Sequence, residues 1–385
     1  MKIAMLGTRG VPARYGGFET VVEEVGAGLA ERGHDVVVYC RQPWDSEQYR
    51  GMRRVVLPAV RRSALETLSH TLLSAGHALR HRPDAALIFN AANAPAVCVL
   101  TAAGVPTALH VDGHDARRAK WRGAGERYYS LATRWGARVA DRVVVDSAAV
   151  GRELDARHGC ASVFIPYGAR RTVMNSDEVS DLLAPHGLVA GGYHLIVARF
   201  EPENHVLEAV QAYTRSDAHL PLALVGFAGY PGEYARRIAA AADENDTVLR
   251  MGAVWDQQLL DALYAGAASY VHGHSVGGTN PSLLRAMVHR APVLAFDCPY
   301  NRETTAGSAS WWTSVEELST LLADVEHQPA VHRARAQSAQ DRAESAYRWS
   351  AVVEAYDDLV HELAGSKRMR QDGSPSAMDQ MRLTS

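Results

Sequence analysis

Two kinds of apolar pattern alternate along the first half of the chain. Short continuous runs predict buried strands, and between them apolar residues recur every three or four positions, which predicts helices. The clearest helical set is Phe18, Val21, Val22, Val25 and Leu29. The predicted strands are 2–7, 34–40, 54–57, 86–89, 107–111, 142–145 and 163–165. This alternation of strand and helix predicts a mostly parallel sheet with helices on both faces.

The alternation stops at Pro166 and resumes at His194, after a polar stretch that runs to about Pro185. The strands predicted beyond it are 194–198, 222–225, 248–251, 269–271 and 292–296. Open parallel sheets bind ligands beyond the carboxyl ends of their strands. We therefore predict an α/β protein of two doubly wound, Rossmann-like domains that face each other across a cleft.

Length and pattern together set the expected domain bounds. A chain of 385 residues is too long for one hydrophobic core. We expect an N-terminal domain over 1–170 and a C-terminal domain over 185–345. A last helix within 346–365 is expected to cross back to the N-terminal domain. No aromatic residue follows position 365, so 366–385 is expected to be a disordered tail.

Charge narrows the class of partner. Forty basic residues stand against 43 acidic ones, a formal charge of −3, which argues against nucleic acid as the partner. Only three of the basic residues are lysines, and either a GC-rich genome or selection for phosphate-binding guanidinium groups would explain this bias. A local basic cluster could make weak peripheral contact with anionic lipid headgroups, or it could be ordinary solvated surface. It consists of Arg50, Arg53, Arg54, Arg61 and Arg62.

The cysteines and the least polar segment exclude two further classes. Cys40, Cys98, Cys160 and Cys298 form no CxxC pair, which excludes a zinc ribbon and gives no support for a disulfide framework. Such thiols suit a reducing cytoplasm, where we expect the protein. The segment 85–109 carries no charge, but turn residues divide it into strand, helix and strand, so we predict no membrane span there.

The strongest candidate site follows the predicted strand 269–271. Gly277, Gly278 and Thr279 precede Asn280, a good helix N-cap, and Pro281, which suits a first helical turn. Free backbone amides and the positive end of the helix would attract a phosphate there. Capping alone would not require the Gly-Gly-Thr sequence.

Three further candidate segments follow predicted strands. Gly16 and Gly17 stand just before the first helix, where they allow either close approach of an anion or only a tight turn. Arg199 ends the strand 194–198 and could neutralise a diphosphate or pair with a neighbouring glutamate. Asp112 lies in His110-Val111-Asp112-Gly113-His114-Asp115, where the glycine breaks the geometry of a metal site. We predict a polar group at the cleft and no metal.

Six segments together resemble a known family. The chain is similar to family 4 retaining glycosyltransferases of the GT-B fold, in the subgroup associated with rhamnosyl transfer. The resemblance extends to about residue 363. The matching segments are GTRGVPARYGGFET (7–20), ALETLSHT (64–71), NAANAP (90–95), VDG…RAKW (111–121), VARFEPEN (197–204) and HGHSVGGTNPSLLRAM (272–287).

The resemblance implies a reaction and a role for each domain. The acceptor would bind to the N-terminal, acceptor-side domain (1–170), and the nucleotide sugar to the C-terminal domain (185–345). A sugar would move from a nucleoside-diphosphate donor, most simply dTDP-L-rhamnose, to a saccharide or small glycoside, with retention at the anomeric carbon. Arg199 matches the diphosphate arginine, Gly277–Asn280 match the phosphate loop, and Gly16 and Gly17 match the loop that faces the diphosphate. Asp112 matches the polar residue beside the anomeric centre. No cofactor or metal is implied if arginine and helix amides meet the charge of the leaving group.

Three positions depart from the wider family. Arg285 replaces a glutamate thought to bind the ribose hydroxyls, Gly277 replaces a second glutamate, and Asn204 replaces a frequent lysine. The changes at 277 and 204 agree with the rhamnosyl subgroup, whereas Arg285 does not. A guanidinium only donates hydrogen bonds, so Arg285 would contact a phosphate or mark altered ribose binding. A non-catalytic partner protein of this fold and a sugar-nucleotide 2-epimerase remain the alternatives to a transferase.

Overall fold

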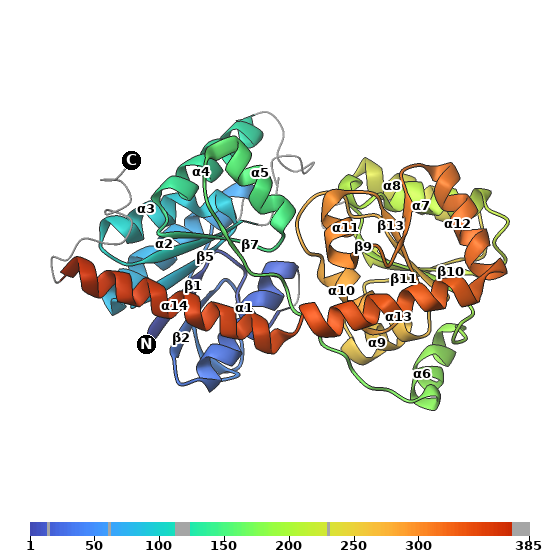
Figure 1. Cartoon of the computed structure of the whole chain (residues 1–385), viewed down its shortest axis with the longest axis horizontal. Helices are drawn as coiled ribbons and strands as arrows, with labels where there is room; N and C mark the ends of the chain where they lie inside the picture. Colours follow the sequence, from blue (N-terminus) through green and yellow to red (C-terminus); the bar gives the residue numbers. More distant parts are fainter. Residues whose placement is uncertain (14–15, 61–62, 112–123, 229–231, 372–385) are drawn as a thin grey trace. The chain divides into compact units, whose positions relative to one another are not determined.

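The computed structural model describes residues 1–13, 16–60, 63–111, 124–228 and 232–371. The chain divides into two compact units (Figure 1). Of the described residues, unit 1 contains those within 1–111, 124–167 and 349–371, and unit 2 contains those within 168–348. Unit 2 therefore begins at Gly168, before the polar stretch that we expected to join the domains.

Unit 1 contains an eight-stranded sheet in the order β3-β4-β2-β1-β5-β6-β7-β8. The strands are β1 (Lys2–Leu6), β2 (Asp35–Cys40), β3 (Gln48–Tyr49), β4 (Met52–Val56), β5 (Ala85–Phe89), β6 (Thr107–Val111), β7 (Arg142–Val145) and β8 (Val163–Phe164). Every pairing is parallel except β3 with β4. The strand order reverses direction at β1 and β5, which makes their carboxyl ends the switch point of this sheet.

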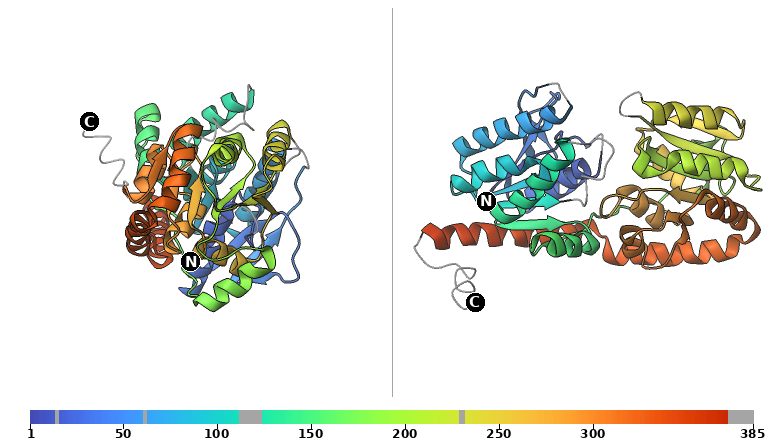
Figure 2. Two further views of the ribbon diagram at one scale, coloured as in Figure 1. Left: turned by 90° about the vertical axis from the view of Figure 1, so that its right-hand side faces the viewer. Right: turned by 90° about the horizontal axis from the view of Figure 1, so that it is seen from above.

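Helices cover both faces of this sheet, as right-handed crossovers require (Figures 1 and 2). They are α1 (Gly17–Glu31), α2 (Ser63–His81), α3 (Ala94–Ala102), α4 (Ala124–Val139), α5 (Ala148–His158) and α14 (Trp349–Gln371), with a 3-10 turn η1 (Ala91–Asn93). Helix α14 packs on α1, where the side chain of Val353 fills the space left by Gly28. Its buried face is Val352, Val353, Tyr356, Leu359, Val360 and Leu363. Helix α14 also continues to Gln371, through the first residues of the expected tail.

Unit 2 contains a six-stranded parallel sheet in the order β11-β10-β9-β12-β13-β14. Its strands are β9 (His194–Arg199), β10 (Leu222–Phe227), β11 (Val248–Gly252), β12 (Ser269–His272), β13 (Val293–Phe296) and β14 (Ser310–Trp312). Its helices are α6 (Ser176–Leu183), α7 (Val206–Arg215), α8 (Glu233–Asp243), α9 (Gln257–Ala265), α10 (Pro281–Val288), α11 (Pro299–Thr305), α12 (Val315–His327) and α13 (Pro329–Ala346), with 3-10 turns η3 (Ala184–His186) and η4 (Pro202–Asn204). The order reverses direction at β9 and β12.

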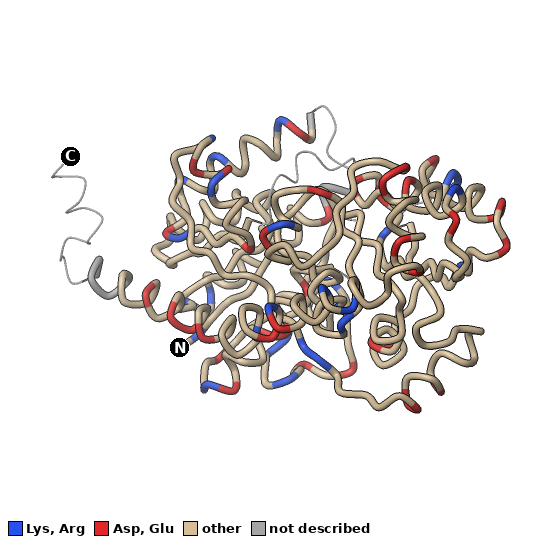
Figure 3. Tube along the Cα trace, turned by 45° about the vertical axis from the view of Figure 1, so that its right-hand side comes forward, with Lys and Arg blue, Asp and Glu red and all other residues tan. Residues whose placement is uncertain are grey.

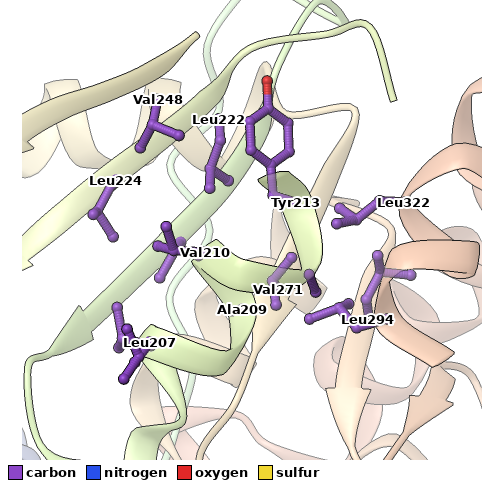
Figure 4. Close-up of a cluster of buried hydrophobic side chains, with 14 of the residues drawn as sticks. Leu207, Ala209, Val210, Tyr213, Leu222, Leu224, Val248, Val271, Leu294 and Leu322 are labelled. Carbon is purple, nitrogen blue, oxygen red and sulfur yellow. The ribbon is translucent and has the colours of Figure 1, made fainter. Parts of the chain in front are cut away.

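One buried hydrophobic cluster of unit 2 lies between the sheet and the helices on one of its faces (Figure 4). Leu207 and Val210 of α7 belong to one buried cluster with Leu222 and Leu224 of β10. Leu322 of α12 closes the same cluster. This packing fixes the strands β9 and β10, and thereby the position at which Arg199 ends its strand.

The uncharged segment 85–109 is strand β5, helix α3 and the start of β6, as predicted. Among the described residues no helix is both long and apolar enough to cross a membrane. The polar stretch before residue 185 is not a plain linker, because it contains α6. Asn175 and Glu178 form a capping box at the start of that helix, which stabilises its first turn.

Candidate functional site

The two most specific sequence motifs of unit 2 lie at the switch point of its sheet. Strands β9 and β12 are hydrogen-bonded neighbours, with Ile196 opposite Val271. Arg199 ends β9 and His272 ends β12, so the segments that follow them leave the same edge of the sheet side by side. A ligand of an open parallel sheet binds at such an edge.

Polar contacts join these two segments. The carbonyl oxygen of Glu203 accepts a hydrogen bond from the backbone N–H of Ser275 at 3.0 Å, and Nδ1 of His205 lies 2.7 Å from the carbonyl oxygen of Gly273. A Cβ at Gly273 would overlap the carbonyl oxygen of Asn204, so glycine allows this approach. The two segments therefore act as one structural unit.

Asn204 is buried at the centre of this contact. Its Nδ2 donates to the carbonyl oxygen of Arg199 at 2.8 Å, and its Oδ1 lies 2.6 Å from Nδ1 of His274, which donates to it. We predicted Asn204 as a donor-binding residue, but both ends of its amide are used within the protein. The described contacts make it a residue that links the end of β9 to the loop after β12.

The glycine-rich loop leads into α10 as expected. Asn280 is the N-cap, and its side chain accepts a hydrogen bond from the N–H of Ser282 at 2.9 Å. Gly277 has a φ of 125°, a conformation that other residues rarely adopt. Gly277, Gly278 and Thr279 are buried. The loop thus reaches the N-terminus of α10 in a compact, ordered conformation.

Arg285 lies one helical turn further along α10 and is paired within the protein. Its Nε donates to Oδ1 of Asp261 on α9 at 2.5 Å, and its Nη1 and Nη2 donate to Gln257. Thr172 donates to the other oxygen of Asp261 at 2.5 Å, and Nε2 of His289 lies 3.2 Å from Oδ1. These contacts tie α10 to α9, which no sequence motif had indicated.

The Asp261 carboxylate is 5 % exposed. Burial by itself raises the pKa of Asp261, but hydrogen bonds and charge from His289, Arg285 and Thr172 outweigh it and hold that pKa at about 2. The acid is therefore ionised at neutral pH, and Arg285 supplies the balancing charge.

In unit 1 the segment 7–17 leaves the sheet at the switch point between β1 and β5. Asn93 after β5 donates from Nδ2 to the carbonyl oxygen of Gly7 at 3.3 Å. Gly16 has a φ of 93° and is the N-cap of α1. A Cβ at Gly17 would lie 2.8 Å from the ring of Tyr167, so this glycine is required by packing.

Two carboxylates of α1 and one buried arginine hold the same segment. Glu19 accepts a hydrogen bond from the N–H of Arg9 at 3.2 Å, and Glu23 accepts one from the N–H of Ala13 at 2.5 Å. Nε of Arg54 donates to the carbonyl oxygen of Val11 at 2.8 Å. The sequence analysis assigned this role to none of the three residues, although the acidic residues of the first helical turns were a visible signal.

Arg54 also corrects the interpretation of the basic cluster. Its remaining nitrogens donate to the carbonyl oxygens of Gln42 and Ser46, and the side chain is buried, so it cannot reach a lipid headgroup. Arg50 forms ion pairs with Glu23 and Glu24. Arg61 and Arg62 lie outside the described residues. Elsewhere in the described chain basic and acidic positions are interspersed (Figure 3).

Asp112, His114 and Asp115 lie outside the described residues. The strand β6 that leads to them ends with His110 and Val111, both buried. His110 stacks on Phe89 and Tyr167 and meets Phe18 edge-on. Among the described residues neither ring nitrogen of His110 finds a hydrogen-bond partner, and burial lowers its pKa to about 3.

Comparison with known proteins agrees with this geometry. Residues 16–168 match the family model of the glycosyl transferase 4-like domain. Sucrose-phosphate synthase from Thermosynechococcus elongatus superposes with a TM-score of 0.79 over 95 % of this chain and 99 % of its own, at 20 % identity. The chain has the GT-B fold. Both Rossmann-like units of a GT-B protein are thus present.

Two other GT-B structures cover nearly the whole chain. The Anabaena protein HepE, solved with UDP-glucose, has a TM-score of 0.75 at 17 % identity and covers 94 % of this chain and all of its own. The UDP-forming trehalose-phosphate synthase from Burkholderia vietnamiensis has a TM-score of 0.70 at 12 % identity, with 94 % and 99 % coverage. No curated protein matches the sequence significantly.

Proposed function

We propose that this GT-B protein is a glycosyltransferase that moves a sugar from a nucleoside-diphosphate donor to a saccharide or small glycoside. The observation that supports this most is that Arg199 ends β9 and the segment leading to the Gly277–Asn280 loop follows the neighbouring strand β12, at the same edge of the sheet. Two proteins of similar fold point the same way: HepE was solved with UDP and with UDP-glucose, and the trehalose-phosphate synthase is named as UDP-forming.

The chemistry needs positive charge where the donor breaks. As the bond from the sugar to the diphosphate breaks, negative charge builds on the leaving oxygen, and donors already in place lower the barrier. In this proposal Arg199 supplies a permanent cation with a fork of donors, and the N–H groups at the start of α10 supply partial charge. Nδ2 of Asn204 donates to the carbonyl oxygen of Arg199, and His274 holds Asn204 in place by donating to its Oδ1, so the end of β9 is positioned.

The finer assignments are part of the proposal. The donor is a deoxy-sugar nucleotide, most simply dTDP-L-rhamnose, and the reaction retains the anomeric configuration. Gly16 and Gly17 of unit 1 face the diphosphate, and Asp112 acts beside the anomeric centre. Gly17 is already packed against Tyr167, so any approach of the donor to this segment is made by backbone atoms.

The proposal is tested by donor-dependent release of nucleoside diphosphate. Purified protein is incubated with dTDP-L-rhamnose, UDP-glucose and other nucleotide sugars, with and without a panel of saccharide acceptors. We expect release that requires both donor and acceptor, and a product whose linkage, assigned by NMR, has the donor's anomeric configuration. An inverted linkage would overturn retention alone, and absence of turnover with every pair would overturn the transferase.

A non-catalytic nucleotide-sugar-binding partner protein is the second candidate. Arg285 favours it, because the position where the wider family has a ribose-binding carboxylate here carries a guanidinium that is paired with Asp261. Calorimetry on the same donors separates the candidates. Donor binding without turnover supports the partner protein, and binding with turnover supports the transferase.

A further inference from the structure

Three side chains with metal-binding chemistry converge where α14 lies against the turn between α1 and β2. His34 lies in the turn between α1 and β2, and Asp357 and His361 lie on α14. Their ligand atoms are all within 4.8 Å of one another. Nε2 of His34 is 2.8 Å from Oδ1 of Asp357, and Nδ1 of His361 is 3.3 Å from the same oxygen.

The spacing of these groups suits a small divalent ion. Asp357 and His361 are four residues apart on one helix, so their side chains share a face, the spacing that helical zinc motifs use for paired ligands. A tetrahedral zinc ion with ligands at about 2.1 Å holds its ligand atoms about 3.4 Å apart. The separations of 2.8 and 3.3 Å are near that value, so small side-chain movements would admit an ion.

A further contact holds Asp357 in place. Nη1 of Arg32 donates to Oδ2 of Asp357 at 2.8 Å, which leaves Oδ1 directed at the two imidazoles. A hydrogen bond to the outer oxygen of a ligating carboxylate is typical of metal sites.

The three candidate ligands differ in how far their side chains are exposed. The side chain of His34 is 7 % exposed, that of Asp357 is 19 % exposed and that of His361 is 61 % exposed. Two ligands are therefore fixed by the fold, while the third can rotate from its 2.9 Å contact with the carbonyl oxygen of Asp357 to meet an ion from solvent. Water would complete the coordination on the exposed side.

We propose that His34, Asp357 and His361 bind one divalent transition-metal ion of the zinc class, which clamps α14 to the N-terminal part of unit 1. Two imidazoles and one carboxylate are a ligand set that such ions favour. The site is structural, and its existence does not depend on sugar transfer.

The test uses the full chain without a histidine tag, stripped with a chelator and dialysed. Titration with zinc by calorimetry should show one equivalent bound, and cobalt at the same site should give the visible absorption of a low-coordinate complex. The His361→Gln variant should weaken zinc affinity by at least about tenfold, because one of three protein ligands is lost. His361 is largely exposed, so this variant should fold.

The matched control is His327→Gln, which removes an exposed histidine of unit 2. It should bind zinc as the wild type does. At the same zinc concentration the melting temperature should rise more in the wild type and in the control than in His361→Gln. No binding in the wild type, or the same affinity in wild type and His361→Gln, would overturn the site and leave an ordinary ion pair.

Discussion

Nε of Arg285 donates a 2.5 Å hydrogen bond to Oδ1 of Asp261, joining α10 to the helix before it. Both the loop in front of α10 and the orientation of α10 itself therefore depend on a pair that lies 24 positions apart in the sequence. Arg285 holds the helix whose N-terminus we assign to phosphate. In the proposed enzyme it is a positioning residue.

Removing Arg285 should destabilise unit 2. In Arg285→Ala the Asp261 carboxylate stays buried without its cation, and we expect a loss of about 2–3 kcal/mol in the free energy of unfolding. The double variant Asp261→Asn/Arg285→Ala should lose less than the sum of the single variants, measured by urea titration. Strict additivity would contradict the coupling.

The same pair predicts an acid dependence. The pKa of Asp261 is about 2 in the folded protein and 3.8 as an ordinary value, so its pairing stabilises the fold above about pH 4. That contribution is lost as the pH falls toward 2. The stability difference between the wild type and Asp261→Asn should therefore shrink over this interval, and a difference independent of pH would argue against an ionised Asp261.

Arg199→Ala should weaken binding of nucleoside diphosphate. Loss of a charge-assisted hydrogen bond costs about 1.5–3 kcal/mol, which is roughly a 10- to 150-fold rise in Kd. Calorimetry with dTDP and UDP measures it. Arg215→Ala is the matched control. Arg215 forms an exposed ion pair with Glu316, so this variant should bind nucleotide normally. Equal affinities in the two variants would remove Arg199 from the site.

Gly273→Ala should push apart the segments that follow β9 and β12. The added methyl group would overlap the carbonyl oxygen of Asn204, and we expect a loss of about 1–3 kcal/mol in stability together with weaker nucleotide binding. Gly76→Ala in α2 is the control, because nothing lies within 4 Å of its added Cβ. That control should be stabilised by about 0.5–1 kcal/mol. Thermal melts and nucleotide titrations of both variants decide the matter.

Buried neutral histidines should make the protein sensitive to mild acid. Burial lowers the pKa of His70 to about 4 and those of His110 and His272 to about 3, against an ordinary value of 6.5. Below pH 6.5 the unfolded chain therefore takes up protons that the folded chain does not. Stability should fall by about 1.4 kcal/mol per pH unit for each histidine.

His110→Phe tests this for one of the three. Its neighbours are Phe18, Phe89 and Tyr167, so a phenyl ring suits the position. Urea titrations between pH 7 and pH 5 give the free energy of unfolding at each pH. Its dependence on pH should be weaker in the variant, by the equivalent of about one proton. An unchanged slope would mean that His110 does not stay neutral in the fold.

Local patterns predicted most of the fold. Each of the strands expected from apolar runs is present, because a strand buried on both faces needs such a run wherever it lies in the sheet. The two-residue strand β3 and the short β14, Ser310–Trp312, were missed, since they carry too few residues to form a pattern. Helix α6 was missed because its surface is largely polar, although Asn175 and Glu178 marked its start.

The candidate site was predicted in part. Arg199 and the Gly277–Asn280 loop could be proposed because strand ends and helix caps have local signatures. Arg199 ends β9 and the segment that leads to the loop follows the neighbouring strand β12, and their role in binding stays a prediction. The partners of Arg285 and Asn204 were not predicted, because Asp261 and His274 come from segments that only the folded chain brings near. The sequence could not show which polar groups already have hydrogen-bond partners within the protein.

The order of the two units along the chain also affects the order in which they can fold during synthesis. Unit 1 takes its last helix from residues 349–371, after the whole of unit 2 has been synthesised. Until then Gly28 of α1 lacks the side chain of Val353 that covers it, while every segment of unit 2 from Gly168 onward is already available. During synthesis unit 2 can therefore fold before unit 1 is complete. Unit 1 is completed only when helix α14 becomes available.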